Sequence, residues 1–337
     1  MKAVSRRATI YDVAHLAEVS SATVSRVLNE PDRVAPEKRE RVQKAIQTLG
    51  FVPKADAVAK ARRAYRKIGV IAPFFTQPSF MERLRGIATV LSSEHYELVI
   101  YAISGEDDVL NYVQMLVNTQ RVDGLIMLCV RLDEHTVELL RNASFPTCFV
   151  ENEYEGFDSV SVQNIQGGQL AAQFLHEKGS VHPGFIGEGS KLSYAVPATE
   201  ERLQGFRFYF ANQGIVIAES HIWVGEFTEN NLDKGITDYL SQKTLPDSIF
   251  CSSDVIAARF VRIASAMNIR VPRDIRVIGF DNINIAEYLS LTSVSQDLEH
   301  SGAMAAELVL SRIQNPERGI TTMKVPIQII ERDSTGR

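Results

Sequence analysis

Apolar and polar residues follow two different periods over most of this chain. From Ile68 onward, short runs rich in Val and Ile alternate with longer segments whose apolar residues recur every three or four positions. The short runs predict buried strands, and the longer segments predict helices. The expected strands are residues 68–74, 96–102, 122–130, 146–151, 159–162, 182–188, 221–225, 248–253, 275–281 and 323–330. The expected helices are residues 79–94, 107–119, 134–142, 166–178, 198–213, 229–241, 254–267 and 297–314.

Repeated strand–helix units with Val- and Ile-rich strands indicate parallel sheets covered by helices on both faces. About 270 residues are too many for one such core, so we expect two similar lobes with a ligand between them. The lobes are predicted roughly at residues 68–165 plus 296–322 and at residues 166–295 plus 323–337. The predicted body is therefore an α/β domain, 68–337, built from two parallel-sheet lobes.

The first fifty residues have helical spacing instead, and they predict a small all-α head at residues 1–52. Thr9 is suited to cap a helix, and Asp12 at the third helical position favours the same helix end. Ser20 is suited to cap a second helix that runs to about Asn29. Two short helices joined by a tight turn are typical of the helix-turn-helix of DNA-binding proteins, although such a pair can also serve only to pack. A third helix is expected from Pro36 to about Leu49, with Leu49 facing inward.

The second predicted helix begins with small polar residues, which let its backbone and hydroxyl groups approach DNA closely. Arg26 follows one turn later and can reach a guanine edge or a phosphate. Residues 53–67 form a linker rich in alanine and basic residues, with Pro53 at a suitable first helical position. A short isolated helix is marginal in water, so this linker either orders on DNA or remains a solvated basic tether.

Charge is unevenly distributed over the 337 residues, whose net charge is −5. Residues 1–67 contain 15 Lys and Arg against 7 Asp and Glu, whereas the remainder contains 21 against 34. A basic head on an acidic body is expected when only the head meets phosphates.

Cysteine, histidine and glycine patterns argue against several other classes of protein. The three cysteines are scattered through apolar runs, which favours a reducing compartment without a disulfide framework. The chain shows neither an apolar run of membrane length nor the apolar core of a signal peptide, so we expect a cytoplasmic protein. The seven histidines lack metal-ligand spacing, and the nucleotide-binding and hydrolase motifs are missing. We therefore expect no enzyme, no metal and no cofactor.

Three consecutive motifs carry a resemblance to a known family. These are TIYDVAHLAEVSSATVSRVLN at residues 9–29, V-x-x-x-x-R-x-R-V at 34–42 and LGFVP at 49–53. In this order they resemble the LacI family of bacterial repressors. The body also resembles that family's effector domain, which is itself similar to periplasmic sugar-binding proteins, so the resemblance covers essentially the whole chain. It implies a transcription regulator, most simply a repressor, that binds a near-palindromic operator as a homodimer. It also implies a small-molecule effector, a sugar or sugar derivative.

The resemblance places the DNA contacts in the head and in the hinge at 53–67. The residues it implies are Thr9, Ile10, Tyr11, Ser20, Ser21, Ala22, Thr23, Ser25, Arg26, Asn29, Arg33, Lys54 and Lys60. Lys60 stands where the family has a leucine that acts as an apolar wedge in the minor groove. Lysine cannot unstack bases cheaply because its ammonium would have to leave water. We therefore expect weaker DNA bending and a steeper salt dependence than in relatives with the wedge.

Side chains that follow strands are the candidates for the effector site. The resemblance implies Glu151, Arg202, Ser253 and Asp281, and it also points to Phe227. Carboxylates accept hydrogen bonds from sugar hydroxyls, and arginine donates a two-pronged pair. Aromatic rings can stack on a sugar or belong to the core, and the candidates here are Phe74, Phe75 and Phe80. Surface charge or helix capping is the alternative for the polar residues, and we expect capping for Asp254.

A second class of function is a cytoplasmic sugar-binding protein that lacks operator-specific DNA binding. The small polar residues and arginine at 21–26 argue against it.

Overall fold

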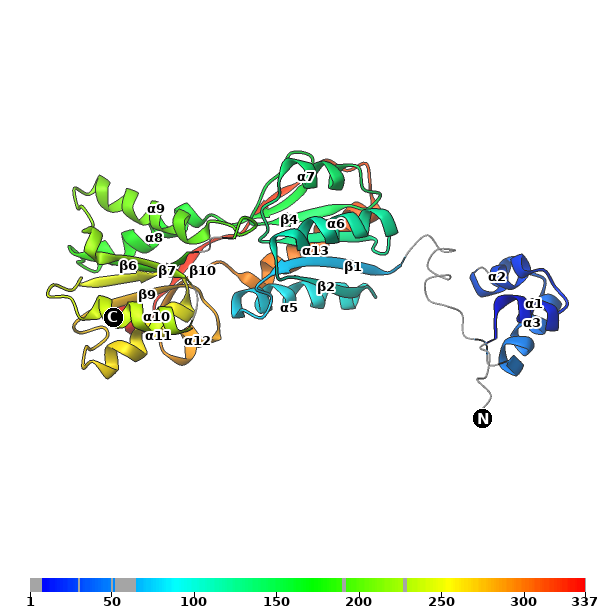
Figure 1. Ribbon diagram of the computed structural model, residues 1–337, viewed down its shortest axis with the longest axis horizontal. Coiled ribbons are helices and arrows are strands. Elements are labelled where there is room, and N and C mark those ends of the chain that lie inside the picture. The colour runs from blue at the N-terminus through cyan, green and yellow to red at the C-terminus, as the bar shows by residue number, and fades with distance from the viewer. Residues whose placement is uncertain are drawn as a thin grey trace. The chain divides into compact units, whose positions relative to one another are not determined.

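The computed structural model describes residues 8–29, 31–49, 51, 65–189, 192–226 and 229–336. It divides into two compact units, a head with residues 1–67 and 121–123, and a body with the rest of the chain (Figure 1). The hinge residues Lys54 and Lys60 and the candidate Phe227 lie outside the described residues.

The head is helical. Its elements are α1 (Ile10–Leu16), α2 (Ser21–Asn29), a 3-10 turn (Pro31–Arg33) and α3 (Pro36–Leu49). The Thr9 side chain accepts a hydrogen bond from the Asp12 amide at 3.3 Å, and the Asp12 carboxylate accepts one from the Thr9 amide at 2.7 Å. This reciprocal capping box confirms the predicted helix start. The Ser20 hydroxyl likewise accepts from the Thr23 amide at 3.1 Å at the start of α2.

One apolar cluster holds the three head helices together. Its buried members are Val13, Ala14, Ala17, Val24, Val27, Val42 and Ala45. Leu49, which we expected to face inward, is 36% exposed. It is the last residue of α3, where the helix has run past the small core.

The body contains two six-stranded sheets. The first has the order β11-β5-β4-β3-β1-β2, and the second has the order β12-β10-β9-β8-β6-β7. The first sheet consists of β1 (Lys67–Pro73), β2 (Glu97–Ile103), β3 (Gly124–Leu128), β4 (Thr147–Val150), β5 (Asp158–Ser161) and β11 (Thr322–Lys324). The second consists of β6 (Pro183–Gly189), β7 (Ile222–Glu226), β8 (Ser248–Cys251), β9 (Arg276–Asp281), β10 (Thr292–Ser295) and β12 (Gln328–Ile330).

Helices cover both faces of each sheet, as the strand composition predicted (Figure 1). In the first lobe these are α5 (Pro78–Ser93) and α13 (Leu298–Gln314) on one face, with α6 (Glu106–Thr119) and α7 (Glu134–Arg141) on the other. In the second lobe they are α8 (Asn164–Glu177) and α9 (Ala198–Asn212) on one face, with α10 (Glu229–Leu240) and α11 (Asp254–Ala266) on the other. The chain crosses between the lobes after β5, after β10 and after β11.

The strand predictions differ from the structure in two places. The strand expected at 323–330 is two strands, because the third crossing divides it and β11 and β12 belong to different sheets. The strand β10 was not predicted, although it pairs with β9 in parallel. The sequence of β10, Thr292 to Ser295, is polar and so did not indicate a strand. Its buried hydroxyl groups find hydrogen-bond partners only in the folded chain. The Ser293 hydroxyl donates to Asp254 at 2.6 Å, for example. The short helix α12 (Asn284–Tyr288) was also missed.

The two lobes repeat one another. In the first sheet β3 pairs with β1 and β4, and in the second sheet β8 pairs with β6 and β9. Leu125 and Ile249 are equivalent, since each faces a glycine on one side, Gly69 or Gly184. On the other side Leu125 faces Thr147 and Ile249 faces Val277. Thr147 and Val277 are therefore equivalent as well. Four residues after them, where β4 and β9 end, lie Glu151 and Asp281, which are equivalent in turn.

Helix pairs show the same repeat. A Cβ on Gly302 of α13 would lie 2.0 Å from the carbonyl oxygen of Arg83 on α5, and one on Gly168 of α8 would lie 2.0 Å from that of Arg202 on α9. Glycine therefore allows each helix pair to approach closely. The sequence carries the repeat as E-R-L-x-G at 82–86 and 201–205 and as G-x-x-A-A at 168–172 and 302–306. Arg83 and Arg202 are thus equivalent residues.

Candidate functional site

The head presents the predicted DNA-contact residues on the side of α1 and α2 that is not packed. Val24 and Val27 are buried in the head core, whereas Arg26 is exposed. Tyr11 is 73% exposed. Ser20, Ala22 and Arg33 are also exposed, and Thr9, Ile10, Ser21, Thr23 and Ser25 are partly exposed. Asn29 is the last residue of α2. The arrangement leaves the polar start of α2 and its arginine available to a groove of DNA.

A cavity of about 570 Å³ lies between the two lobes of the body. The first lobe contributes Phe74, Gln77, Pro78, Ser79, Phe80, Arg83, Cys129 and Glu151 to its lining. The second contributes Glu188, Gly189, Leu192, Ala195, Val196, Ala198, Thr199, Glu200, Arg202, Glu226, Ser253, Val255 and Asp281, and Gln296 comes from a crossing segment. The polar residues follow strand ends or helix starts, where ligands of parallel sheets bind.

Arg83 organises the first-lobe wall. Its side chain is 2% exposed, and its Nη2 atom forms an ion pair with the Glu151 carboxylate. Its Nη1 atom donates to the Cys129 sulfur at 3.0 Å, and its Nε atom donates to the Ser301 hydroxyl at 3.3 Å. Burial raises the pKa of the Cys129 thiol, so the sulfur accepts this bond in its neutral form. The arginine is thereby fixed with one carboxylate as its counter-charge.

Arg202 has the matching place in the second-lobe wall. Its Nε atom donates to the Asn164 amide oxygen at 2.9 Å, and its Nη1 atom donates to the Ser252 carbonyl oxygen at 2.6 Å. Nη1 also lies 3.9 Å from the Asp281 carboxylate, and the guanidinium stacks on the ring of Phe280 at 3.7 Å. Each lobe therefore places one buried arginine–carboxylate pair at the cavity.

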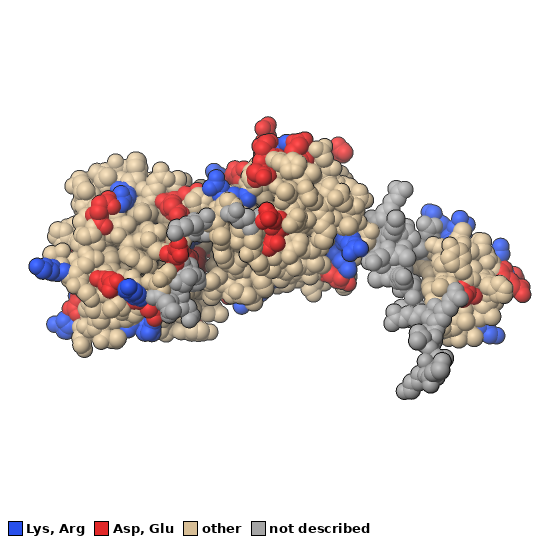
Figure 2. Space-filling view, viewed as in Figure 1, with Lys and Arg blue, Asp and Glu red and all other residues tan. Residues whose placement is uncertain are grey.

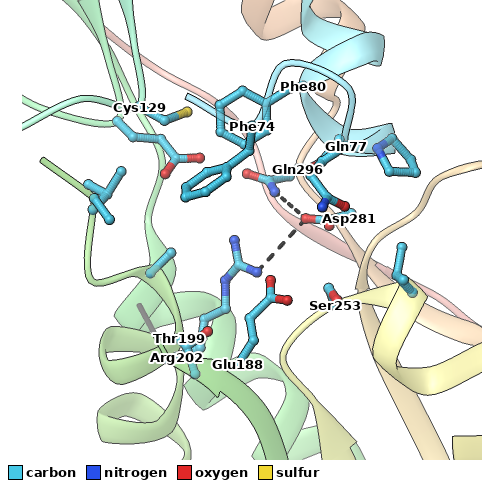
Figure 3. Close-up of a pocket in the computed structure, with 18 of the residues that line it drawn as sticks. Phe74, Gln77, Phe80, Cys129, Glu188, Thr199, Arg202, Ser253, Asp281 and Gln296 are labelled. Carbon is cyan, nitrogen blue, oxygen red and sulfur yellow. Dashed lines mark hydrogen bonds and ion pairs between the residues drawn. The ribbon is translucent and has the colours of Figure 1, made fainter. Parts of the chain in front are cut away.

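Gln296 connects these two pairs across the crossing segment. Its amide oxygen accepts from Arg83 at 3.1 Å. Its amide nitrogen donates to Asp281 at 2.5 Å (Figure 3). The polar groups thus form a continuous chain from Glu151 in the first lobe to Arg202 in the second. All members of this chain line the cavity.

Burial perturbs the carboxylates near the cavity. It raises the pKa of Glu188 to about 7, with a further contribution from the charge of Asp281. Burial also raises the pKa of Asp281, although Arg202 and Arg83 oppose that shift. Groups that are costly to ionise in an empty cavity can gain from a ligand that donates hydrogen bonds.

The structure brings six of the eight predicted effector residues to the cavity. These are Phe74, Phe80, Glu151, Arg202, Ser253 and Asp281. Phe75 is absent from the lining and packs against the first-lobe core. Phe227 is outside the described residues.

Asp254 does not cap α11 as expected, because Ser253 is the cap residue. The buried Asp254 carboxylate instead accepts from the Ile283 amide at 2.9 Å. It thereby holds the turn at Asp281 and Asn282, whose φ angles of 109° and 56° are positive.

The site residues predicted from the sequence did not include Arg83, Gln77, Glu188 and Gln296, which all line the cavity. The signal for Arg83 was present, since E-R-L-x-G at 82–86 repeats the segment around Arg202. Gln296 and Glu188 carried no comparable signal, because a glutamine in a crossing and a glutamate at a strand end are common.

Neither a metal site nor a membrane-spanning helix is found among the described residues. No group of three or more His, Cys, Asp or Glu side chains among them is placed to hold a metal ion. Within the same parts of the chain, no helix has the length and apolar character needed to cross a membrane.

A helix-turn-helix head on a two-lobed body with a polar cavity between the lobes defines a DNA-binding regulator. The family model described as "Bacterial regulatory proteins, lacI family" matches residues 9–54. A second model, "Periplasmic binding protein-like domain", matches residues 172–335. The chain belongs to the LacI family, and it is a DNA-binding transcriptional repressor.

Similar proteins extend over almost the whole chain. The repressor PurR of Photobacterium profundum is 31% identical over 330 residues, which are 96% of this chain and 97% of that protein. The repressor CytR of Escherichia coli (strain K12) is 30% identical over 334 residues, which are 97% of this chain and 96% of that protein. Both are named as transcriptional repressors, which confirms that this chain is a regulator and not an enzyme.

Solved structures agree on the fold. A complex of the regulator CelR with cellobiose is 28% identical, with a TM-score of 0.70 over 97% of this chain and all of the other. A LacI-family regulator from Silicibacter pomeroyi is 25% identical, with a TM-score of 0.83 over 98% of this chain and all of the other. The Lac repressor dimer bound to its operator is 23% identical, with a TM-score of 0.79 over 98% of this chain and all of the other, and it shares the fold.

Proposed function

We propose that a small molecule, a sugar or sugar derivative, binds in the cavity and changes the affinity of this repressor for its operator. The observation that carries the proposal is the polar chain from Glu151 through Arg83, Gln296 and Asp281 to Arg202. Because both lobes and a crossing segment contribute to it, a ligand bound against it contacts both lobes at once. Such a ligand binds one lobe arrangement better than another and shifts the population accordingly.

The lining suits a hydroxylated ring. Carboxylates accept hydrogen bonds from hydroxyl groups, and the guanidiniums donate them. Phe74 and Phe80 lie edge to face with their ring centroids 6.3 Å apart, on the side of the cavity opposite Arg202 (Figure 3). An aromatic side chain can cover the apolar face of a sugar ring. The regulator CelR, which shares this architecture, was solved with cellobiose.

For the DNA end of the mechanism, we propose a homodimer on a near-palindromic operator. One small recognition helix gives little affinity alone, whereas two linked heads gain from each other's binding. In this proposal residues 1–52 are the DNA-binding head, residues 53–67 are the hinge, and residues 68–337 bind the effector and dimerise.

The operator contact is tested at Arg26. We expect Arg26→Ala to weaken binding to an operator selected from random DNA by about 1–3 kcal/mol and to leave unrelated DNA less affected. Arg41→Ala is the matched control, since Arg41 is an exposed cation of α3 that pairs with Glu18 at 3.8 Å. It should lower both affinities by a similar factor. If Arg26→Ala and Arg41→Ala show the same ratio of operator affinity to affinity for unrelated DNA, Arg26 does not contribute to operator recognition.

The effector site is tested at Asp281. Asp281→Ala should abolish the response of operator binding to the effector found in a thermal-shift panel of sugars, while binding to the operator persists. Asp274→Ala is the control, because Asp274 forms a surface pair with Arg270 away from the cavity lining. Calorimetry that shows wild-type effector affinity in Asp281→Ala would place the effector elsewhere.

A further inference from the structure

Glu188 is an additional carboxylate in the second-lobe wall. Arg83 is matched by Glu151, and Arg202 is matched by Asp281, in equivalent positions of the two lobes. Gly69 on β1 and Gly184 on β6 are equivalent residues. Four residues after them lie Pro73 in the first lobe and Glu188 in the second, so Pro73 is the counterpart of Glu188. The second-lobe wall therefore contains one carboxylate, Glu188, that has no counterpart in the first lobe.

In the described part of the chain, the Glu188 carboxylate has neither a hydrogen-bond donor nor an ion-pair partner. It makes no hydrogen bond and no ion pair with any described residue, although its backbone amide donates weakly to Ser252. Figure 3 shows the carboxylate at the cavity between Arg202 and Ser253. The side chain is partly buried, and burial raises its pKa to about 7. A carboxyl group in this position is stabilised as an anion when a donor from the cavity reaches it.

The charges of the wall distinguish between classes of effector. Among the described residues, the lining contains five carboxylates and two guanidiniums, and both guanidiniums already face a carboxylate. A phosphorylated or carboxylated effector would bring another negative charge into this partly desolvated space, which is unfavourable. A neutral sugar would bring no positive charge to Glu188. An ammonium group supplies a positive charge with three hydrogen-bond donors.

The opposite wall is compatible with a cation as well. The rings of Phe74 and Phe80 face the cavity across from Glu188 (Figure 3). The face of an aromatic ring attracts a positive charge, most strongly where water is excluded. Both walls therefore favour the same sign of ligand charge.

Building on the effector role proposed above, we propose that this cavity takes an effector that combines hydroxyl groups with a protonated amine, an amino sugar, and that Glu188 binds its ammonium group. The two arginine–carboxylate pairs then bind the hydroxyl groups. The amine is the part of the ligand that distinguishes it from its neutral and anionic relatives.

The test uses the full chain in a buffer free of amines. The probes are glucosamine, galactosamine and mannosamine, each beside its parent sugar, its N-acetyl derivative and its 6-phosphate. Thermal shift finds the ring that binds, and calorimetry then measures the members of that set. We expect the amine to bind about tenfold or more tightly than its three relatives. The parent sugar and the N-acetyl derivative lose the charge-assisted hydrogen bond, and the 6-phosphate brings a further negative charge into the cavity.

Glu188→Gln keeps the size of the side chain and removes its charge. It should reduce the preference for the amine to near unity and leave the affinity for the parent sugar within a few-fold of the wild type. Glu177→Gln is the control, because Glu177 is an exposed carboxylate at the end of α8. It should retain the full preference. If Glu188→Gln does not fold, the comparison between amine and parent sugar in the unaltered protein still decides the ligand class.

The outcomes separate this inference from the function on which it rests. Tighter or equal binding of the parent sugar, the N-acetyl derivative or the 6-phosphate overturns the amino-sugar assignment and leaves a sugar effector in place. An amine preference that survives in Glu188→Gln overturns the assignment of Glu188. The absence of a shift with every member of the panel overturns both this inference and the proposed sugar effector.

Discussion

At the scale of single residues, two arginines decide what the cavity can do. Both are almost fully buried, and a carboxylate and several hydrogen-bond acceptors surround each guanidinium. A buried ion pair adds little net stability compared with apolar packing, but removing one partner leaves the other charge without compensation. The pairs are thus better explained by ligand binding than by the stability of the fold.

We expect Arg83→Ala to lower the free energy of unfolding by about 3–5 kcal/mol, because Glu151 would remain buried without its counter-charge. Arg85→Ala, two residues along the same helix, should cost less than about 1 kcal/mol, since Arg85 is 54% exposed and its ion pairs are at the surface. Urea unfolding measures both variants. Similar costs would show that the burial of the Arg83 pair has no energetic consequence.

The raised pKa of Glu188 predicts a pH dependence of stability. Its carboxyl group holds its proton more tightly when folded, with a pKa of about 7, than in the unfolded chain, where the value is near 4.5. The folded state therefore binds more protons between these values, and stability falls as the pH rises through this window. Glu188→Gln should flatten that part of the profile. Asp254, whose pKa burial raises to about 8, should preserve a slope at higher pH.

Urea midpoints at several pH values between about 5 and 8.5 measure this profile. The exposed Glu177→Gln serves again as the control and should follow the wild type. Parallel profiles for wild type and Glu188→Gln would contradict the shifted pKa.

At the scale of helices and strands, closely packed helix pairs position the arginines. α5 packs on α13 in the first lobe, and α8 packs on α9 in the second, with glycine at each close approach. The carbonyl oxygens that these glycines contact belong to Arg83 and Arg202. The depth of each arginine in its wall is therefore set by how closely its helix pair approaches.

Gly302→Ala should push α13 away from α5, since the added carbon would lie 2.0 Å from the Arg83 carbonyl oxygen. We expect a loss of about 1–3 kcal/mol in unfolding free energy, together with weaker effector binding. Gly319→Ala is the control, because nothing lies within 4 Å of the added carbon and φ is not positive there. It should stay within about 0.5 kcal/mol of the wild type. Unchanged stability and effector affinity in Gly302→Ala would show that the helices can separate at no cost.

At the scale of the whole molecule, the head and the body differ in the sign of their charge. Residues 1–67 have an excess of basic residues, and the remainder has an excess of acidic ones. On the face of the body in Figure 2, acidic side chains are spread over both lobes and interspersed with basic ones. The body is thus suited to remain off the phosphate backbone while the head binds it.

We expect the body to dimerise without the head, because the two heads of a proposed dimer must be linked through it. A chain that begins at Tyr65 suits this test, since the amides of Tyr65 and Lys67 donate to Asp123 at 2.8 and 3.1 Å and would be retained. Sedimentation at micromolar concentration should give a dimer for this chain and for the full chain. Monomers of the truncated chain beside dimers of the full chain would assign dimerisation to the segment before Tyr65.

Local sequence determined most of the elements and part of the site. Strand runs rich in Val and Ile, and the cap at Thr9, fix their structure through near neighbours, and Arg202 and Asp281 could be found from family motifs. Tertiary structure decided the rest, because the chain crosses between the lobes three times. These crossings divide the run at 323–330 between two sheets, and they place Gln296 between Arg83 and Asp281. No local pattern encodes such a contact, since the arginine and the glutamine are 213 residues apart and meet only when both lobes have formed.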